Sequence, residues 1–357
     1  MRYTGLIEKY RDTLPVSEST RIISLGEGNT PLIRLENIPC SMGTQVKLYI
    51  KYEGLNPTGS FKDRGMTMAV TKAFESGSKA IICASTGNTS AAAAAYAARA
   101  GIKAFVVIPE GKIALGKLAQ AMIHGSTIIQ IKGNFDDGMQ LVKEVADFAP
   151  VSIVNSINPF RLEGQKTAAF EIIEELGHAP DYHCLPVGNA GNITAHWMGY
   201  TEYHKAGKSK STPAMLGYQA EGAAPFISGS RIKNPETIAT AIRIGNPQSW
   251  EQALKLSKDS NGWFDCFSDK EILATQKMLT EKEGIFCEPA SAISVAGALR
   301  DIESGKIPDG STVVCTLTGH GLKDPDTAIA QCDQSAMINI NPTLNEVKKA
   351  ILDNMKF

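Results

Sequence analysis

Lys62, in the segment NPTGSFKDRG, has the features of an amine that can form a covalent bond with a carbonyl group. It follows a predicted strand and stands near the N-terminus of a predicted helix, where the helix dipole disfavours an ammonium ion. Arg64 adds a positive charge two residues further on, so we expect the pKa of Lys62 to be lowered. A lysine with a lowered pKa can attack a carbonyl and form an imine. A solvated lysine in the first turn of a helix is the alternative interpretation.

A run of polar residues follows the next predicted strand, in the segment ASTGNTSAAAAA. Hydroxyls, an amide and main-chain N–H groups meet here at a helix start, in Ser85, Thr86, Gly87, Asn88 and Thr89. Such a group can hold a carboxylate or a phosphate. An ordinary helix cap explains one polar residue but not five in a row. The alanines that follow are small enough to let a ligand approach closely.

The segment LPVGNAGNITAHW carries the strongest signal for phosphate binding. Small residues stand between an apolar strand and a helix, at Gly188, Asn189, Ala190, Gly191 and Asn192. They leave N–H groups free to converge on an anion, and the helix dipole adds a partial positive charge. The segment lacks the Lys-Ser or Lys-Thr pair of a nucleotide P-loop and the GxGxxG spacing of a dinucleotide turn. A tight turn without a ligand is the alternative.

A fourth segment, TLTGHG, also follows a predicted strand, and its Thr318 offers a hydroxyl that can meet a ring nitrogen. In open α/β sheets, ligands bind at the carboxyl ends of the strands. Four polar or glycine-rich loops in that position are hard to explain by turn geometry alone. Together they predict one binding site built from distant parts of the chain.

Short β-rich runs alternate with longer helical patterns from residue 46 onward, which is typical of parallel α/β sheets. The runs predict strands at 46–52, 79–84, 103–108, 126–131, 151–155, 182–187, 215–220 and 312–317. The helical patterns predict helices at about 63–76, 88–100, 114–124, 135–148, 160–176, 268–282 and 290–303. We expect an α/β fold of two open, mostly parallel-sheet lobes, with surface or active-site loops at 222–267.

The composition argues against several classes of protein. With 36 basic and 37 acidic side chains, the formal net charge is -1, so no overall field draws the chain to nucleic acid or to a membrane surface. Seven scattered cysteines form no CxxC pair, so we expect neither a metal site nor a disulfide framework. The N-terminus is charged too early for a signal peptide, and the uncharged stretch 80–98 is too polar to span a bilayer. We therefore expect a cytoplasmic protein with neither nucleic-acid nor membrane partners.

In this order, the four loops resemble those of the pyridoxal-phosphate enzymes of the tryptophan-synthase β-like family, or fold type II. The resemblance runs from LGEGNTPL, at about Gly26, to Gly321 and includes the segments VNSINPFRLEGQKT and EPASA. It implies that pyridoxal 5'-phosphate binds in the cleft between the lobes. The implied domains are a smaller α/β domain at 54–158 and a larger, cofactor-binding domain at 1–53 and 159–357. A homodimer is implied as well.

The resemblance also assigns roles to residues. It makes Lys62 the Schiff-base lysine and the catalytic residue, places Asn88 at the ring hydroxyl of the cofactor, and sets Thr318 against the pyridine nitrogen. Residues 188–192 are implied to hold the cofactor phosphate. A hydroxyl at the ring nitrogen stabilises a pyridinium less than a carboxylate would, so elimination and replacement are favoured over transamination.

Within the family, the likeness is greatest to enzymes that convert O-phospho-L-homoserine and water to L-threonine and phosphate by γ-elimination and β-addition of water. Such a carbon–oxygen lyase needs a second phosphate site for its substrate. Candidates are Asn155, Ser156, Arg161 and Lys117 or, less favoured, Lys112, with hydroxyls from Ser85 and Thr86. Asn88 and Thr89 can instead bind the substrate carboxylate.

Other functions use parts of the same pattern. A serine/threonine dehydratase or a cysteine synthase would share the lysine, the anion loop and the ring-nitrogen hydroxyl, but would not need the second phosphate site. A non-catalytic sensor of amino acids or phosphate ligands would keep the loops without the imine, and the intact Lys62 argues against it. A NAD-dependent dehydrogenase is disfavoured by the missing GxGxxG turn.

Overall fold

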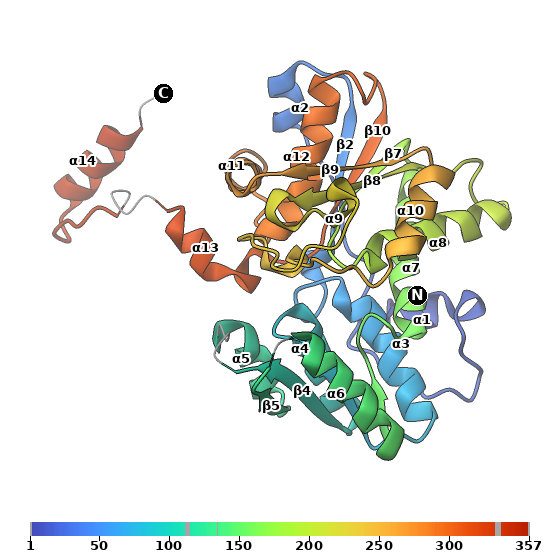
Figure 1. The fold of residues 1–357 in the computed structure, drawn as a ribbon. Coiled ribbons are helices and arrows are strands. Elements are labelled where there is room, and N and C mark those ends of the chain that lie inside the picture. Colours follow the sequence, from blue (N-terminus) through green and yellow to red (C-terminus); the bar gives the residue numbers. More distant parts are fainter. Residues whose placement is uncertain (1, 111–114, 134, 333–336, 356–357) are drawn as a thin grey trace. The chain divides into compact units, whose positions relative to one another are not determined.

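Two sheets organise the chain, of which the computed structural model describes residues 2–110, 115–133, 135–332 and 337–355 (Figure 1). The larger sheet has the strand order β1-β2-β10-β7-β8-β9, in which β1 pairs antiparallel with β2 and the other neighbours are parallel. Its strands are β1 (Leu32–Arg34), β2 (Lys47–Tyr52), β7 (Tyr182–Pro186), β8 (Ala214–Ala220), β9 (Trp263–Phe267) and β10 (Thr312–Leu317). The smaller sheet is parallel throughout, in the order β5-β4-β3-β6. Its strands are β3 (Ala80–Ala84), β4 (Lys103–Pro109), β5 (Thr127–Ile131) and β6 (Val151–Ile153).

Helices connect the parallel strands, as crossover connections require. The longer helices of residues 1–324 are α3 (Lys62–Glu75), α4 (Asn88–Ala100), α5 (Leu115–Ile123), α6 (Phe135–Phe148), α7 (Pro159–Leu176), α8 (Gly191–Lys205), α10 (Trp250–Asp259), α11 (Asp269–Glu283) and α12 (Pro289–Glu303). Three short helices are α1 (Leu6–Lys9), α2 (Asn37–Met42) and α9 (Pro225–Ser228). Helices α4, α5 and α6 accompany the smaller sheet, whereas α12 lies beside the strands of the larger one (Figure 1).

Strand β10 lies at the centre of the larger sheet, and every one of its residues is buried. Val313 is paired with Leu48 of β2 on one side and with Tyr182 of β7 on the other. A strand buried on both faces reads as a continuous apolar run, which explains the sequence TVVCTL. Because β7 and β10 are parallel neighbours, the segments after them, at 187–192 and 318–321, leave from the same edge of the sheet.

In the smaller sheet, β3 pairs in parallel with β6, so the loops that follow Ala84 and Ile153 also share one edge. The helix after β3 is rich in alanine, and residues 91–95 of α4 are all buried. Small side chains let this helix pack closely on the sheet, which is the local reason for the AAAAA sequence. Candidate loops therefore begin at the carboxyl-terminal edges of both sheets.

The sequence-based elements agree with the structure within a few residues, but several elements were not predicted, among them the short helices α1, α2 and α9. Strand β1 was not predicted, because three residues carry too little pattern. The stretch 222–267, predicted as loops, contains α10 and β9, so that prediction was wrong for its last third. Strand β9 is a half-buried edge strand and shows no alternation, and α10 buries only Ala253 and Leu256. Strand β9 is held by its pairing with β8, and α10 packs against α8, β8 and β9.

Residues 1–324 form one compact unit that contains both sheets, and residues 325–357 form a second unit. In the second unit, the described residues form α13 (Pro325–Ala330) and α14 (Leu344–Asn354). The smaller sheet is built from strands within 80–153, and the larger from strands within 32–52 and 182–317. The domain boundaries at 54 and 158 stay a prediction.

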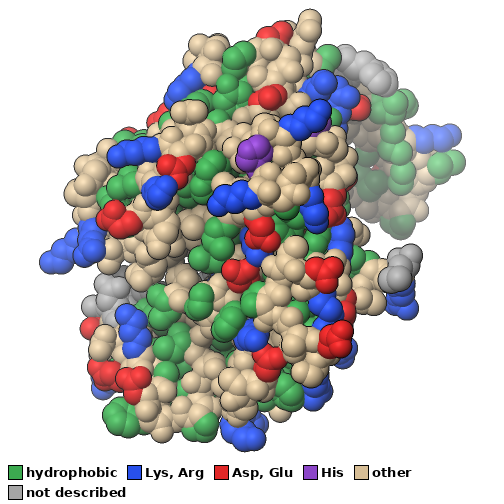
Figure 2. Space-filling model, turned by 90° about the vertical axis from the view of Figure 1, so that its right-hand side faces the viewer, with side chains coloured by type: hydrophobic (Ala, Val, Ile, Leu, Met, Phe, Trp, Pro, Cys, Tyr) green, Lys and Arg blue, Asp and Glu red, His purple; other side chains and the backbone are tan. Residues whose placement is uncertain are grey.

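The surface carries charges of both signs. On the face shown in Figure 2, basic and acidic side chains are interspersed among apolar and uncharged ones. Among the helices in the described ranges, none has the length and apolar composition needed to cross a bilayer. The described residues also contain no group of three histidine, cysteine or acidic side chains placed to hold a metal ion.

Candidate active site

Lys62 opens helix α3, and the loop before it is held against the segment after β10. The Phe61 N–H donates to the Thr318 carbonyl at 2.9 Å, and the His320 N–H donates to the Gly59 carbonyl at 2.9 Å. Gly59 has φ of +85°, a conformation that favours glycine. The lysine loop and the TLTGHG segment, far apart in the sequence, are therefore neighbours, as predicted.

The electrostatic surroundings of Lys62 favour a neutral amine. Burial, and then the positive charge of Arg161, lower the pKa of Lys62 to about 7, while Glu288 acts in the opposite direction. The prediction that Arg64 would lower this pKa was wrong. Arg64 forms ion pairs with Glu53 and Glu171, which neutralise its charge. Arg161, almost a hundred positions away in the sequence, takes the role that was expected of Arg64.

Thr318 belongs to a buried polar cluster that joins both lobes. Its hydroxyl lies 2.9 Å from the Ser291 hydroxyl and donates to Oε1 of Glu288 at 3.2 Å. Nδ2 of Asn88 donates to Oε2 of Glu288 at 3.0 Å. The Glu288 carboxylate therefore links Asn88, at the start of α4, to Thr318, after β10. This places the two residues predicted to contact the ring hydroxyl and the ring nitrogen of one cofactor within reach of the same carboxylate.

Sequence analysis did not assign Glu288 this position. The EPASA segment precedes a helix, and Glu288 is the residue before α12, but its side chain makes no capping bond there. It is 4% exposed and faces the cluster instead. An acidic residue followed by proline at a helix start is so common in ordinary caps that the sequence signal could not distinguish the two roles.

The turn at 188–192 has the form of an anion cradle. Ala190 adopts φ of +61°, and helix α8 begins directly after it at Gly191. Within the described part of the chain, the N–H groups of these five residues donate to no main-chain or side-chain acceptor. Nδ2 of Asn192 is buried and has no hydrogen-bond partner either. Unsatisfied donors at a helix N-terminus are what a bound phosphate would complete, so the residues fit the phosphate of pyridoxal 5'-phosphate.

The polar loop after β3 is half-buried from Ser85 to Thr89. The Gly87 N–H donates to Oγ of Ser85 at 3.2 Å. Asn155 supports this loop from the neighbouring strand end: its Oδ1 accepts from the Ala84 N–H at 3.0 Å, and its Nδ2 donates to the Ala84 carbonyl at 2.9 Å. Both polar atoms of Asn155 are thus engaged with the main chain, and its first effect is to position the loop.

Arg161, near the start of α7, is the most unusual charge in this region. It is 3% exposed, it forms no ion pair with a described carboxylate, and its Nε has no hydrogen-bond partner. Nη1 donates to the Val154 carbonyl at 3.2 Å. Burial lowers the pKa of Arg161 to about 10, still far above neutrality, so the guanidinium is charged. A buried, unpaired cation next to Lys62 is suited to an anionic ligand.

For several residues predicted to bind the substrate, the structure shows where the residue lies but not whether it has that role. Ser156 is half-buried and is the third residue after β6. Lys112 and the side chain of Lys117 lie outside the described residues. The substrate roles of Ser85, Thr86, Thr89, Lys117, Asn155, Ser156 and Arg161 stay predictions.

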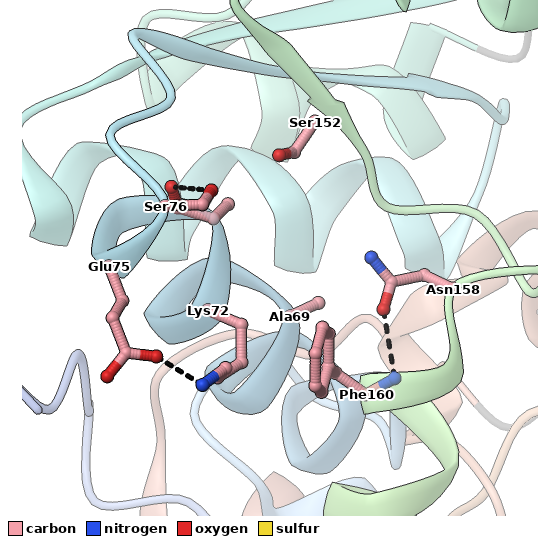
Figure 3. A pocket seen from close by; sticks show the side chains of 8 residues that line it. Ala69, Lys72, Glu75, Ser76, Ser152, Asn158 and Phe160 are labelled. Atoms are coloured by element: carbon pink, nitrogen blue, oxygen red, sulfur yellow. Dashed lines mark hydrogen bonds and ion pairs between the residues drawn. The ribbon is translucent and has the colours of Figure 1, made fainter. Parts of the chain in front are cut away.

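A pocket of about 280 Å³ lies elsewhere, against the C-terminal half of α3 (Figure 3). It is lined by Ala69, Lys72, Ala73, Glu75, Ser76, Ser152, Asn158 and Phe160. Lys72 pairs with Glu75, and Oδ1 of Asn158 accepts from the Phe160 N–H at 3.0 Å. Because these polar groups already have partners, the pocket is a poorer candidate for ligand binding than the region around Arg161.

Comparison with known proteins shows the family to which the chain is similar. Residues 23–319 match the family described as pyridoxal-phosphate dependent enzymes. The chain is 57% identical to a threonine synthase of Synechocystis sp., over 98% of this chain and 91% of the relative. It is also 57% identical to a threonine synthase of Halalkalibacterium halodurans, over 99% of this chain and 98% of the relative. A solved serine racemase from maize superposes with a TM-score of 0.71 at 22% identity, covering 91% of this chain and 93% of the racemase, which shows a shared fold.

Proposed function

The chain belongs to the pyridoxal-phosphate dependent enzymes and, within them, to the threonine synthases, and we propose how its residues divide the work of that reaction. The reaction converts O-phospho-L-homoserine and water to L-threonine and phosphate. Bound pyridoxal 5'-phosphate supplies an aldehyde for covalent attachment of the substrate and a ring that withdraws electrons from its Cα. Residues 188–192 hold the cofactor phosphate, and Asn88 and Thr318 contact its ring.

Lys62 is the proton-transfer residue of the site. Its amine, with a pKa of about 7, is substantially neutral near neutral pH and can accept a proton. We assign it the removal of the Cα proton of the substrate and the transfer of a Cβ proton. Elimination of the γ-phosphate follows, Cγ is protonated, and water then adds at Cβ.

The substrate phosphate binds near Arg161, with Asn155, Ser156, Ser85, Thr86 and Lys117 as further candidates. The single observation that supports this assignment is the guanidinium itself: it is buried, unpaired with any described carboxylate, and lowers the pKa of Lys62. A phosphate dianion bound there would supply the missing partner, and the cation would stabilise the leaving group as it departs.

A serine/threonine dehydratase of the same fold is the rival function. Its substrates carry no phosphate, so a buried and unpaired arginine beside the lysine would have no ligand. Purified holoenzyme should release equal amounts of inorganic phosphate and L-threonine from O-phospho-L-homoserine, and heavy-oxygen water should label the threonine hydroxyl. Formation of 2-oxobutanoate from threonine, without phosphate release from O-phospho-L-homoserine, would establish the rival instead.

We further propose that the enzyme is a cytoplasmic homodimer. The dimer rests on the family resemblance. The cytoplasmic location is consistent with seven cysteines that are all free, including the exposed Cys40 and Cys332. Light scattering of the holoenzyme should give twice the chain mass of 38.3 kDa, and a monomer would contradict the proposal.

A further inference from the structure

Lys323 connects the end of β10 to the helix beside the opposite sheet. It closes the short 3-10 turn η5 (Gly321–Lys323), and its Nζ donates to Oε1 of Gln120 at 2.6 Å. Gln120 belongs to α5, between β4 and β5 of the smaller sheet. The half-buried lysine side chain therefore reaches from one lobe to the other.

The positive charge of Lys323 has no close counterion. No carboxylate of the described residues lies within ion-pair distance of its Nζ, although Asp63 and Glu288 attract it from further away. Burial lowers the pKa of the ammonium group. An ammonium has three donors, and Gln120 accepts from one of them, so donors remain for a ligand. Lys323 thus resembles Arg161: both are partly or wholly buried cations that form no ion pair with a described carboxylate.

The location of Lys323 directs this charge toward the site around Lys62. A Cβ added to Gly59 would lie 3.0 Å from Cε of Lys323, so the lysine packs along the loop that leads to Lys62. On α5, Gln120 follows Lys117 by three positions, and positions three apart share one helix face. Lys323 therefore contacts the helix face that also carries the predicted phosphate-binding residue Lys117.

We propose that Lys323 is a substrate-binding residue whose ammonium group binds the phosphate of O-phospho-L-homoserine together with Arg161. This inference rests on the proposed function. The phosphate group of the substrate carries close to two negative charges near neutral pH, and Arg161 supplies only one positive charge. The substrate carboxylate can be bound by the neutral hydroxyls and N–H groups at 85–89. The second unpaired cation is therefore assigned to the phosphate.

The test compares ligands with and without a phosphate group, using the holoenzyme. We expect Lys323→Gln to raise both the KM for O-phospho-L-homoserine and the inhibition constant of inorganic phosphate by about 10- to 100-fold. Binding of L-threonine, followed by the absorbance of the bound cofactor, should be unchanged because threonine carries no phosphate. Lys323→Arg should retain most of the phosphate affinity. Lys277→Gln, which removes an exposed charge on α11, is the matched control. It should change the affinity for neither inorganic phosphate nor L-threonine.

Gln120→Ala separates phosphate binding from a purely mechanical contact between the lobes. If Lys323 binds phosphate directly, this variant should keep the affinity for inorganic phosphate. Equal losses for threonine and phosphate in Lys323→Gln, or the same phosphate defect in Gln120→Ala, would overturn the assignment. Failure of the wild-type enzyme to form threonine from O-phospho-L-homoserine would instead overturn the proposed function, and this outcome is visible before any variant is made.

Discussion

Arg64 and Arg161 are both almost completely buried, at 1% and 3% exposure, yet their surroundings are opposite. Arg64 donates to Glu53 at 2.7 Å and to Glu171 at 2.6 Å, and these carboxylates raise its pKa. Arg161 has no described carboxylate partner, its Nε is unsatisfied, and burial lowers its pKa to about 10. The first arginine is neutralised by the protein, whereas the second leaves its charge available for a ligand.

The difference separates a structural charge from a functional one. Lys51 joins Glu171 at 2.8 Å, so the Arg64 network holds two positive and two negative groups. It also fixes the LGEGNTPL segment, because the Asn29 N–H and the Thr30 hydroxyl donate to Glu171 and Glu53. A buried charge costs several kcal/mol unless it is paired. An unpaired one is tolerated where a ligand or a reaction makes use of it.

The largest effect is expected at Lys62, the amine whose pKa is lowered by the charge of Arg161. Lys62→Ala should lower turnover by about 10⁴-fold or more, because no other described amine is placed at the start of α3. The adduct that borohydride traps between cofactor and protein should also disappear. Lys72→Ala, on the outer side of the same helix, is the control and should retain both. Persistent turnover in Lys62→Ala would remove this residue from its assigned role.

The next largest effect is expected in the free energy of unfolding, which should distinguish the two arginines. Arg64→Met should lower the free energy of unfolding by about 3–5 kcal/mol, because it leaves the buried Glu53 without its ion-pair partner and Glu171 with Lys51 alone. Arg161→Met removes a charge that has no partner, so it should lower the free energy of unfolding far less. Denaturant titration of both proteins measures the difference. Equal destabilisation would mean that Arg161 has a structural partner after all.

For substrate affinity we expect the reverse order, with a larger loss in Arg161→Met than in Arg64→Met. In Arg161→Met, kcat/KM for O-phospho-L-homoserine should fall by about 10²-fold, and inhibition by inorganic phosphate should weaken in parallel. Arg161→Lys should recover part of the phosphate affinity, since a lysine keeps the charge but lacks the bidentate geometry. Steady-state kinetics with phosphate as a competitor provide the measurement. Unchanged phosphate inhibition in Arg161→Met would contradict the assignment.

The smallest expected effect is a shift in the pH profile. The neutral form of Lys62 increases as pH rises through about 7, so kcat/KM should rise over the same range. Removing the positive charge in Arg161→Met removes a repulsion that disfavours the ammonium form of Lys62. The pKa of Lys62 should therefore rise, and the ascending limb should move to higher pH by up to about one unit. Lys72→Met should leave the limb in place, and a shift there would show that the effect is not local.

Much of the fold follows from local pattern. The apolar run of β10 and the alanine-rich start of α4 are visible in the sequence because burial on both faces and close helix packing demand particular side chains. The anion turn at 188–192 is visible for a similar reason, since an anion can approach main-chain N–H groups closely only where the side chains between strand and helix are small. Strand β9 was missed because four of its five residues are half-buried, so its sequence shows no alternation of apolar and polar residues; its place is set by pairing with β8.

The contacts around Thr318 could not be derived in this way. The Glu288 carboxylate joins Asn88 and Thr318 across 230 positions of the chain, and no periodicity encodes such a contact. Lys323 was overlooked for the same reason, because its partner Gln120 lies 203 positions earlier. Both residues stand in or beside segments that sequence analysis had marked, but their roles depend on which side chains meet in space.

The amino-acid order alone determined where anions can be held by the main chain, because that property needs only a few consecutive residues at the end of a strand. It also predicted which amine reacts, at Lys62. Only the tertiary structure decided which buried cation is paired with carboxylates, since the sequence gives no sign that Arg64 meets Glu53 and Glu171. Counterions act over a few ångströms, and the carboxylate of Glu171 reaches Arg64 across 107 positions. Distance in space, rather than spacing along the chain, therefore assigned structure to one arginine and function to the other.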